Sequence, residues 1–260
     1  MKNNVHACLT LLEHGSMRFN WETENTNRTD FFETLLSPEK KLVPVQLIHS
    51  KTVLAVNTET DTHNVLADGI ITCNKNLVPV VTVADCMPIF LFEPNTGCFG
   101  VLHSGWKGTG IVIEALKLAK ETYHAKEQDF HVIIGPHIKK CCYTIDRERA
   151  EFFKTEIDPC CVEKIDANKY SLSLEKANLF LLEKAGVKKE RITVIGSCTN
   201  CSTNDEKHAQ YGSFRRETNH LPENTPLQER LKNFTPMAAF AYWGDPTSTM
   251  NDAHILIHKM

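Results

Sequence analysis

From about residue 41 onward, the chain alternates short apolar runs with polar turn residues. Apolar runs bounded in this way are typical of buried β-strands. The pattern predicts strands over residues 42–48, 77–84, 87–92, 98–102, 131–134 and 192–195, and a turn with a short strand over 66–72. The last two full strands are each closed by a glycine, Gly135 and Gly196.

Two further segments have the apolar spacing of amphipathic helices. In the first, which begins near Ile111, apolar side chains recur on one face at positions 112, 116, 119 and 123. In the second, Ser173 is a suitable N-cap and Gly186 a suitable stop for a helix with apolar positions 174, 177, 181, 182 and 185. Asp146 is a suitable cap for a third helix, over residues 147–157.

The chain has 260 residues and contains neither a low-complexity tract nor an internal repeat. Its polar stretches 20–30 and 204–230 are predicted to be surface loops, apart from the segment 211–216. This length suits one α/β domain. We therefore expect residues 1–260 to form a single α/β domain with a C-terminal tail, 244–260.

Composition and charge exclude several classes of protein. Apolar residues make up 42% of the chain, enough for a sizeable core, and the net charge of −3 gives no general attraction for nucleic acid or an anionic membrane. The apolar run 237–243 is far shorter than the roughly 20 residues that span a bilayer. Residues 1–14 lack the features of a signal peptide. We expect no nucleic-acid partner, no membrane association and no obligate protein partner.

The chain contains ten cysteines, which include two adjacent Cys-Cys pairs. In a chain of this size without a secretion signal, reduced thiols in a cytoplasm are the expected state. Cys198-Thr-Asn-Cys201 fits a redox pair or half of a structural zinc site. Because no second Cys-x-x-Cys completes such a site, structural or incidental use of this pair is favoured.

Three of the predicted strands lead to a residue that can bind a metal: His49, Cys86 and His103. Strand ends at one edge of a sheet are common positions for functional side chains. Two imidazoles and one thiolate suit Zn²⁺, and three protein ligands leave a fourth position for water or substrate. By spacing alone, ordinary buried or surface side chains are the favoured interpretation of each residue.

Other candidates for binding and catalysis follow these residues. The stretch from His103 to Gly110 places glycines and Lys107 between a strand and a helix, where the backbone N–H groups around Gly108 are available to an anion. A tight turn is the alternative. Arg215 and Arg216 fit an anion clamp or a solvated pair of charges, and Asp85 fits a proton shuttle or a buried, hydrogen-bonded carboxylate.

Several sequence blocks together resemble the YfiH-like family, also called the polyphenol oxidase or laccase-domain family of purine nucleoside phosphorylases. They are Gln46-Leu-Ile-His-Ser50, Ala67-Asp-Gly69, Ala84-Asp-Cys-Met-Pro88, His103-Ser-Gly-Trp-Lys-Gly108, Gly135-Pro136 with Cys141-Cys-Tyr143, Cys198-Thr199 and Ser213-Phe-Arg-Arg216. The resemblance is strongest over residues 40–243. It implies a layered α/β/β/α fold with mixed sheets, and a metal bound by His49, Cys86 and His103.

The resemblance also implies a cytoplasmic enzyme that takes purine nucleosides and phosphate as substrates, and that catalyses phosphorolysis and adenosine deamination. Copper-dependent phenol oxidation and peptidoglycan editing are other assignments made to the family, and a non-catalytic binding protein is a third possibility. Ser104 and Lys107 depart from the alanine and arginine of the family pattern, and Thr218-Asn-His220 departs from its Thr-Gly-Arg. Because these departures fall on segments expected to bind anions or line the site entrance, they concern substrate choice and leave the metal ligands unchanged.

Overall fold

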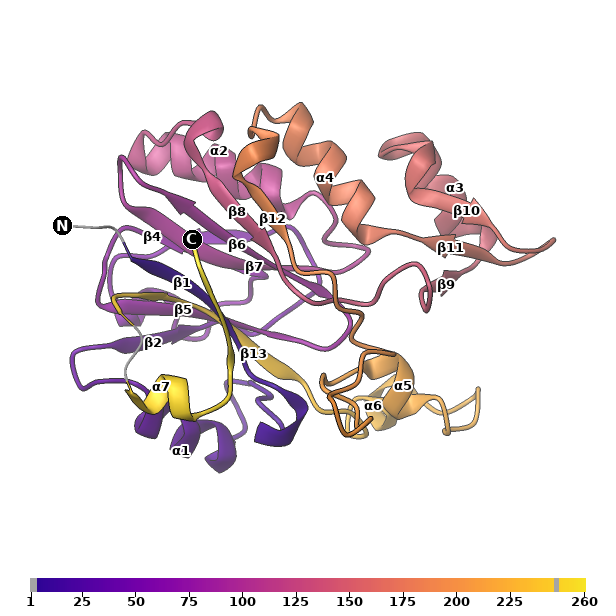
Figure 1. Ribbon diagram of the computed structural model, residues 1–260, viewed down its shortest axis with the longest axis horizontal. Helices are drawn as coiled ribbons and strands as arrows, with labels where there is room; N and C mark the ends of the chain where they lie inside the picture. Colours follow the sequence, from indigo (N-terminus) through magenta and orange to yellow (C-terminus); the bar gives the residue numbers. More distant parts are fainter. Residues whose placement is uncertain (1–3, 246–247) are drawn as a thin grey trace.

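The computed structural model describes residues 4–245 and 248–260; residues 1–3 and 246–247, which the expected domain includes, lie outside the described residues. Two large β-sheets pack face to face, and helices cover the outer face of each sheet (Figure 1). The layered, mixed α/β fold expected from the sequence is confirmed. Within the described residues, no helix is long and apolar enough to span a bilayer.

One sheet has six strands in the order β12-β8-β6-β7-β4-β3. Its strands are β3 (Val53–Ala55), β4 (Gly69–Thr72), β6 (Met87–Glu93), β7 (Cys98–Ser104), β8 (His131–Ile134) and β12 (Ile192–Val194). The central β6 pairs antiparallel with β7 and β8, whereas the pairs β12–β8 and β3–β4 at the edges are parallel. The strands expected in this sheet are confirmed, and β7 continues through His103 to Ser104.

The other sheet has five strands in the order β14-β1-β13-β5-β2. Its strands are β1 (Val5–Leu9), β2 (Lys41–Pro44), β5 (Leu77–Val83), β13 (Met237–Trp243) and β14 (Leu256–Lys259). Strand β1 lies between β13 and β14 and pairs antiparallel with both. Residues from the two ends of the chain therefore lie side by side, and the segment expected as a tail supplies an edge strand.

The helices cover the outer faces of the two sheets. Helices α2 (Ile111–Tyr123) and α4 (Leu174–Lys184) cover the six-stranded sheet, and α1 (Thr26–Leu35) and α7 (Ser248–Asp252) cover the five-stranded sheet (Figure 1). The expected N-cap of α4 is confirmed, because the Ser173 side chain accepts a hydrogen bond from the Lys176 amide. Short 3₁₀ turns occur at Leu12–His14, Glu59–Thr62, Glu127–Asp129, Pro159–Cys161 and Lys189–Arg191.

Apolar side chains fill each interface between these layers. Leu116 and Leu182 pack between the helices and the six-stranded sheet. Phe90 and Val101 of the six-stranded sheet pack between the two sheets, and Phe32 of α1 packs with the outer face of the five-stranded sheet. This sandwich makes a rigid base for the loops that leave the strand ends.

A small lobe extends from one end of the sandwich (Figure 1). It contains α3 (Arg147–Glu156) and a three-stranded sheet in the order β10-β11-β9, and the predicted cap Asp146 accepts from the Arg149 amide. The strands are β9 (Thr144–Ile145), β10 (Val162–Lys164) and β11 (Tyr170–Leu172). Two short helices, α5 (Phe214–Thr218) and α6 (Leu227–Arg230), lie in the polar segment 204–230.

Three sequence expectations about local structure were wrong. The segment 204–230, expected to be a surface loop apart from 211–216, also contains α6 and the end of α5. Residues 20–30 are only partly a loop, because α1 begins at Thr26, where the Asn25 side chain caps it by accepting from the Arg28 amide. The strand expected over 42–48 ends at Pro44. A proline has no amide proton to donate to a neighbouring strand, so the segment that leads to His49 leaves the sheet early.

Candidate metal centre

The structure brings His49, Cys86 and His103 together. The nearest ligand atoms of the three side chains all lie within 4.8 Å of one another, and the two imidazole rings meet edge to face with centroids 5.0 Å apart. His103 is buried, Cys86 is half-buried and His49 is exposed. The group of ligands is therefore fixed in the protein on one side and open to solvent on the other.

The three side chains come from different kinds of backbone, which corrects the expectation of three strand ends. Only His103 lies in a strand, where it pairs with Pro88. Cys86 lies in the turn between β5 and β6, and His49 lies in a bend beyond β2. His49 has a φ of 57°, in the left-handed region that residues other than glycine rarely adopt.

Asp68 fixes the positions of His49 and His103 through hydrogen bonds. No role was expected for it from the sequence. Its buried carboxylate accepts hydrogen bonds from the His49 amide at 2.8 Å, from the Ser50 amide at 2.6 Å and from the Ser50 hydroxyl at 2.7 Å. It also lies 3.1 Å from His103 Nδ1. Carboxylates commonly orient ligating histidines in this way. The only sequence indication was the Ala67-Asp-Gly69 block.

The electrostatics of the site favour a cation. Burial opposes a charge on His103, but the Cys86 sulfur and the Asp68 carboxylate outweigh it and raise the pKa of His103 to about 9. Burial lowers the pKa of His49, and the neighbouring His103 lowers it further. The negative groups around His103 thus stabilise positive charge at the centre of the group, as they would for a bound metal ion.

The glycine-containing turn after β7 closely approaches these ligands. A Cβ at Gly105 would lie 2.9 Å from Cys86 Sγ, and a Cβ at Gly108 would lie 2.8 Å from the Ser50 carbonyl oxygen. Lys107 is exposed on this turn, with its Nζ 5.4 Å from the centre of the Trp106 ring. The turn thus carries a positive charge beside the site, while its glycines allow close packing.

Asp85 connects the site to two distant segments. One carboxylate oxygen accepts from the Thr199 hydroxyl at 2.7 Å, and the other accepts from the Arg215 amide at 2.7 Å. Burial raises the pKa of Asp85, although these hydrogen bonds act in the opposite direction. Of its two proposed roles, this geometry matches the buried, hydrogen-bonded carboxylate. Thr199 is a further residue to which the sequence assigned no role, and its only indication was the Cys198-Thr199 block.

The two arginines occupy different environments. Arg215 is partly buried. Its guanidinium lies 5.8 Å from the centre of the Tyr143 ring and donates a hydrogen bond to the Thr144 carbonyl. Arg216 donates to three backbone carbonyls, those of Thr199, Asn200 and Tyr211. This binding of main-chain oxygens gives Arg216 a structural role in the segment, whereas Arg215 has donors left for a ligand.

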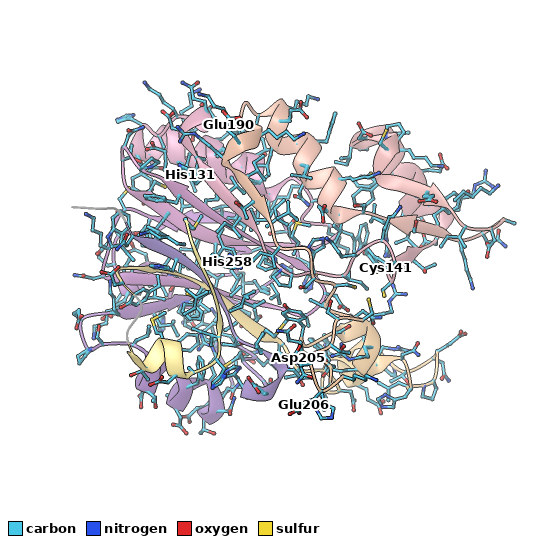
Figure 2. The ribbon with its side chains drawn as sticks, in the orientation of Figure 1. His131, Cys141, Glu190, Asp205, Glu206 and His258 are labelled. Carbon is cyan, nitrogen blue, oxygen red and sulfur yellow. The ribbon has the colours of Figure 1, made fainter. Side chains whose placement is uncertain are left out.

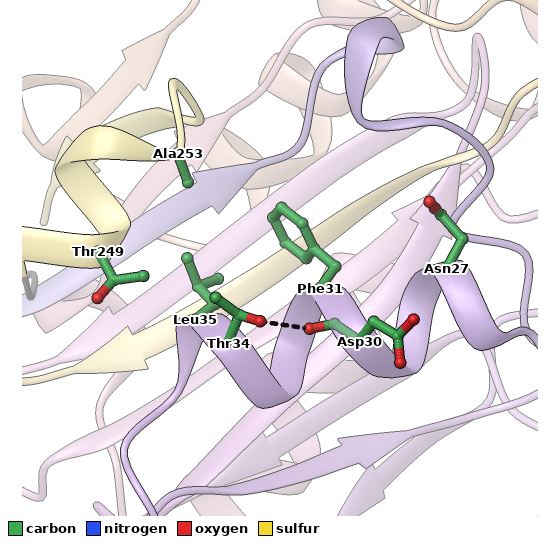
Figure 3. Close-up of a pocket in the computed structure, with 7 residues that line it drawn as sticks. All are labelled: Asn27, Asp30, Phe31, Thr34, Leu35, Thr249 and Ala253. Atoms are coloured by element: carbon green, nitrogen blue, oxygen red, sulfur yellow. Dashed lines mark hydrogen bonds between the residues drawn. The ribbon is translucent and has the colours of Figure 1, made fainter.

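A surface hollow elsewhere does not compete with this centre. It lies between α1 and α7 and is lined by Asn27, Asp30, Phe31, Thr34, Leu35, Thr249 and Ala253 (Figure 3). Its lining includes one carboxylate, no histidine and no cysteine. This hollow therefore offers no candidate for the chemistry of the metal-binding residues at the ends of β5, β6 and β7.

Relatives of the chain have similar sequences over most of its length. The chain is 30% identical over 205 residues to purine nucleoside phosphorylase YlmD of Geobacillus stearothermophilus, which covers 74% of this chain and 73% of the relative. It is 33% identical over 140 residues to purine nucleoside phosphorylase LACC1 of Homo sapiens, which covers 52% of this chain and 32% of the relative. The chain thus matches about a third of the human protein.

Solved structures share the fold. The crystal structure of YlmD from Geobacillus stearothermophilus has a TM-score of 0.77 at 26% identity, over 93% of this chain and 92% of the other. The hypothetical protein YfiH of Bacillus licheniformis also has a TM-score of 0.77, at 22% identity, over 92% and 93% of the two chains. Residues 20–221 match the family model described as multi-copper polyphenol oxidoreductase laccase. Since that match spans most of the chain and includes His49, Cys86 and His103, this protein belongs to the laccase-domain, YfiH-like family.

Proposed function

We propose that this protein is a zinc-dependent purine nucleoside phosphorylase that also deaminates adenosine. The observation that carries the proposal is the convergence of His49, Cys86 and His103 within 4.8 Å, in a chain whose relatives are named purine nucleoside phosphorylases. The substrates are a purine nucleoside and phosphate. The ten cysteines, none of them in a disulfide, support a cytoplasmic location.

The donor set suits zinc. Two imidazole nitrogens and one thiolate are common zinc ligands, and a site with three protein ligands retains a position for a substrate. Asp68 supports this choice because it orients His103 through Nδ1, which leaves Nε2 as the ligand atom. When bound, zinc would supply a Lewis acid that polarises the group placed on it.

The surrounding residues bind and orient the substrates. Phosphorolysis requires phosphate beside the anomeric carbon of the sugar, where positive charge develops as the glycosidic bond breaks. Lys107 and Arg215 provide the positive charge for phosphate, together with the amides around Gly108. Arg216 contributes indirectly, because its hydrogen bonds hold the carbonyls of Thr199 and Asn200 in place.

Deamination additionally requires a group that moves a proton between water and the leaving amine. Asp85 is the nearest carboxylate in sequence to Cys86, and we assign it this role or the positioning of Thr199 and Arg215. The two roles can be separated by experiment. Asp85→Asn retains hydrogen-bonding atoms at both positions but cannot act as a base, so selective loss of deamination supports the proton-transfer role.

The second candidate function is copper-dependent phenol oxidation, which the description of the matching family model favours. Multi-copper chemistry uses many histidines close together. Among the described residues, the group around Cys86 includes two histidines. This donor set favours one zinc over several copper ions. A non-catalytic binding protein is the remaining alternative.

Metal content and product analysis test the proposal. Purified protein should contain zinc, should convert adenosine and phosphate to adenine and ribose 1-phosphate, and should convert adenosine and water to inosine and ammonia, as followed by chromatography. Both activities should be lost together in Cys86→Ala and in His103→Ala, and should persist in the control Cys160→Ala, whose exposed thiol lies outside the site. Activities that separate between these two variants would contradict a shared site.

The alternatives predict different outcomes. If the protein contains copper and oxidises phenols, the oxidase is the correct function. If it shows neither phosphorolysis nor deamination at any metal loading, a non-catalytic binding protein remains.

We also propose that residues 1–260 form one domain. The pairing of β1 with both β13 and β14 supports this, since strands from the two ends of the chain share one sheet.

A further inference from the structure

A second group of metal-binding residues lies outside the site described above. It consists of four cysteines, Cys141, Cys142, Cys198 and Cys201, whose sulfur atoms all lie within 4.8 Å of one another. Cys141 Sγ and Cys201 Sγ are 3.8 Å apart. None of the four belongs to the site of His49, Cys86 and His103. The adjacent pair thus supplies the partner that Cys198-Thr-Asn-Cys201 lacks in the sequence.

The sulfur spacing is that of a metal site. Four sulfurs at about 2.3 Å from a tetrahedral zinc are separated from one another by about 3.8 Å. The observed separations of 3.8 Å and up to 4.8 Å are close to this value. A disulfide requires about 2.0 Å between its sulfurs. The thiols therefore lie close enough to share one metal ion, and they form no disulfide with one another.

The fold positions both halves of this group through the backbone. Strands β8 and β12 are parallel neighbours, so the loops after them leave the sheet together. The His137 carbonyl then accepts from the Thr199 amide at 3.1 Å, which aligns the two loops. Each cysteine pair lies on a tight turn: the Cys142 amide donates to the Lys139 carbonyl at 2.9 Å, and the Ser202 amide donates to the Cys198 carbonyl at 2.9 Å.

A backbone donor already points at one of the sulfurs. The Lys139 amide lies 3.4 Å from the buried Cys198 Sγ, as a hydrogen-bond donor to a thiolate would. Cys142 is half-buried, and Cys141 and Cys201 are exposed. The group therefore has a firmly held inner side and an outer side through which an ion can enter from solvent.

We propose that Cys141, Cys142, Cys198 and Cys201 bind one Zn²⁺ ion as a structural site. Four thiolates leave no position for a substrate, which is typical of structural zinc. The ion would join the loop that leads into the lobe of α3 to the loop that leads to α5. Figure 2 shows Cys141 between these two parts of the molecule.

This position connects the second site to the first. Thr199, which donates to the Asp85 carboxylate, directly follows Cys198 in the chain. The carbonyls of Thr199 and Asn200 accept from Arg216, so the turn inside the Cys-x-x-Cys segment also holds that arginine. Zinc at the four cysteines would therefore stiffen the segment that positions Asp85.

Zinc stoichiometry in two classes of variant tests the proposal independently of the proposed function. Cys201→Ser should lose one zinc per chain by elemental analysis, whether or not His49 and its partners also hold zinc. His49→Ala should keep the zinc of the four cysteines. The matched control is Cys160→Ser, which alters an exposed cysteine of the other adjacent pair and should keep the wild-type zinc content.

Cobalt substitution gives a second measurement that does not depend on activity. Cobalt bound to four thiolates should give strong sulfur-to-metal charge-transfer absorption, which should persist in His49→Ala and should fall in Cys201→Ser to the weaker absorption expected of one thiolate, that of Cys86. Circular dichroism of each variant shows whether it is folded. An equal zinc content in folded Cys201→Ser and wild type would overturn the proposal. So would a disulfide between any of the four cysteines in zinc-loaded protein purified without air, as detected by mass spectrometry after thiol alkylation.

Discussion

Asp68→Asn is the most informative single substitution at the proposed zinc centre. The carboxylate accepts hydrogen bonds from the His49 amide, the Ser50 amide and the Ser50 hydroxyl, and it contacts His103 Nδ1. An asparagine of nearly equal size keeps one acceptor oxygen and turns the other into a donor. In either orientation, the side-chain NH2 group of the asparagine faces a backbone N–H, and neither group can accept a hydrogen bond from the other. The substitution also removes the negative charge beside His103.

The structure allows two magnitudes to be worked out. A hydrogen bond to a charged group contributes about 1.5–3 kcal/mol. Since one backbone N–H loses its charged acceptor, we expect a loss of about 1.5–3 kcal/mol in the free energy of unfolding, measured by urea denaturation. Substitution of a carboxylate that orients a ligating histidine lowers metal affinity by about 10–100-fold. Competition with a chelator should show this decrease for zinc.

Asp61→Asn is the matched control. The exposed Asp61 carboxylate accepts from the same kinds of donor, the amides of Asn57 and Thr58 and the Thr58 hydroxyl, but it contacts no histidine. This variant should lose less stability and should bind zinc as the wild type does. If folded Asp68→Asn keeps wild-type zinc affinity, then Asp68 does not orient a zinc ligand.

Three further predictions concern other parts of the molecule. Lys107→Ala should raise the KM for phosphate about tenfold, the effect of one charge-assisted hydrogen bond, and should raise that for nucleoside less; equal changes would remove Lys107 from the phosphate site. Nearly all ten cysteines should react with a thiol reagent in denatured, metal-free protein kept from air, and two or more stable disulfides would contradict a reducing compartment. Burial lowers the pKa of His6 below its ordinary 6.5, so the unfolded chain binds this proton more tightly and stability should fall as the pH drops below about 6.5. The fall should be smaller in His6→Gln, and equal pH profiles would show that His6 does not contribute.

The sequence predicted the central strands well because their apolar runs reflect burial. Strands β5, β6 and β7 are seven residues each, and nearly every side chain in them is buried. The strands of the small lobe have two or three residues each and could not be recognised. Such short strands form only because α3 and the end of the large sheet hold them in place, and no local pattern records those contacts.

The candidate site, like the fold, was predicted only in part. The residue types of the ligands were predicted from the sequence, and the structure brings them together. Their supports were not predicted, since Asp68 reaches His103 across 35 positions of the chain and Asp85 reaches Thr199 across 114. The four-cysteine group was missed for a similar reason. It depends on the parallel pairing of β8 and β12, which places Cys141 and Cys142 beside a motif that looks incomplete on its own.

The loops at the end of this sandwich have a fixed geometry because two buried carboxylates, Asp68 and Asp85, hold them. Asp68 fixes the bend at His49, and Asp85 fixes the segments of Thr199 and Arg215. Both His49 and Asp85 have a positive φ, 57° and 76°, which costs on the order of 1 kcal/mol for such residues. Such backbone persists only where its surroundings determine it. The hydrogen bonds of each carboxylate supply that constraint, and so the geometry of the centre depends on residues that need not touch a metal or a substrate.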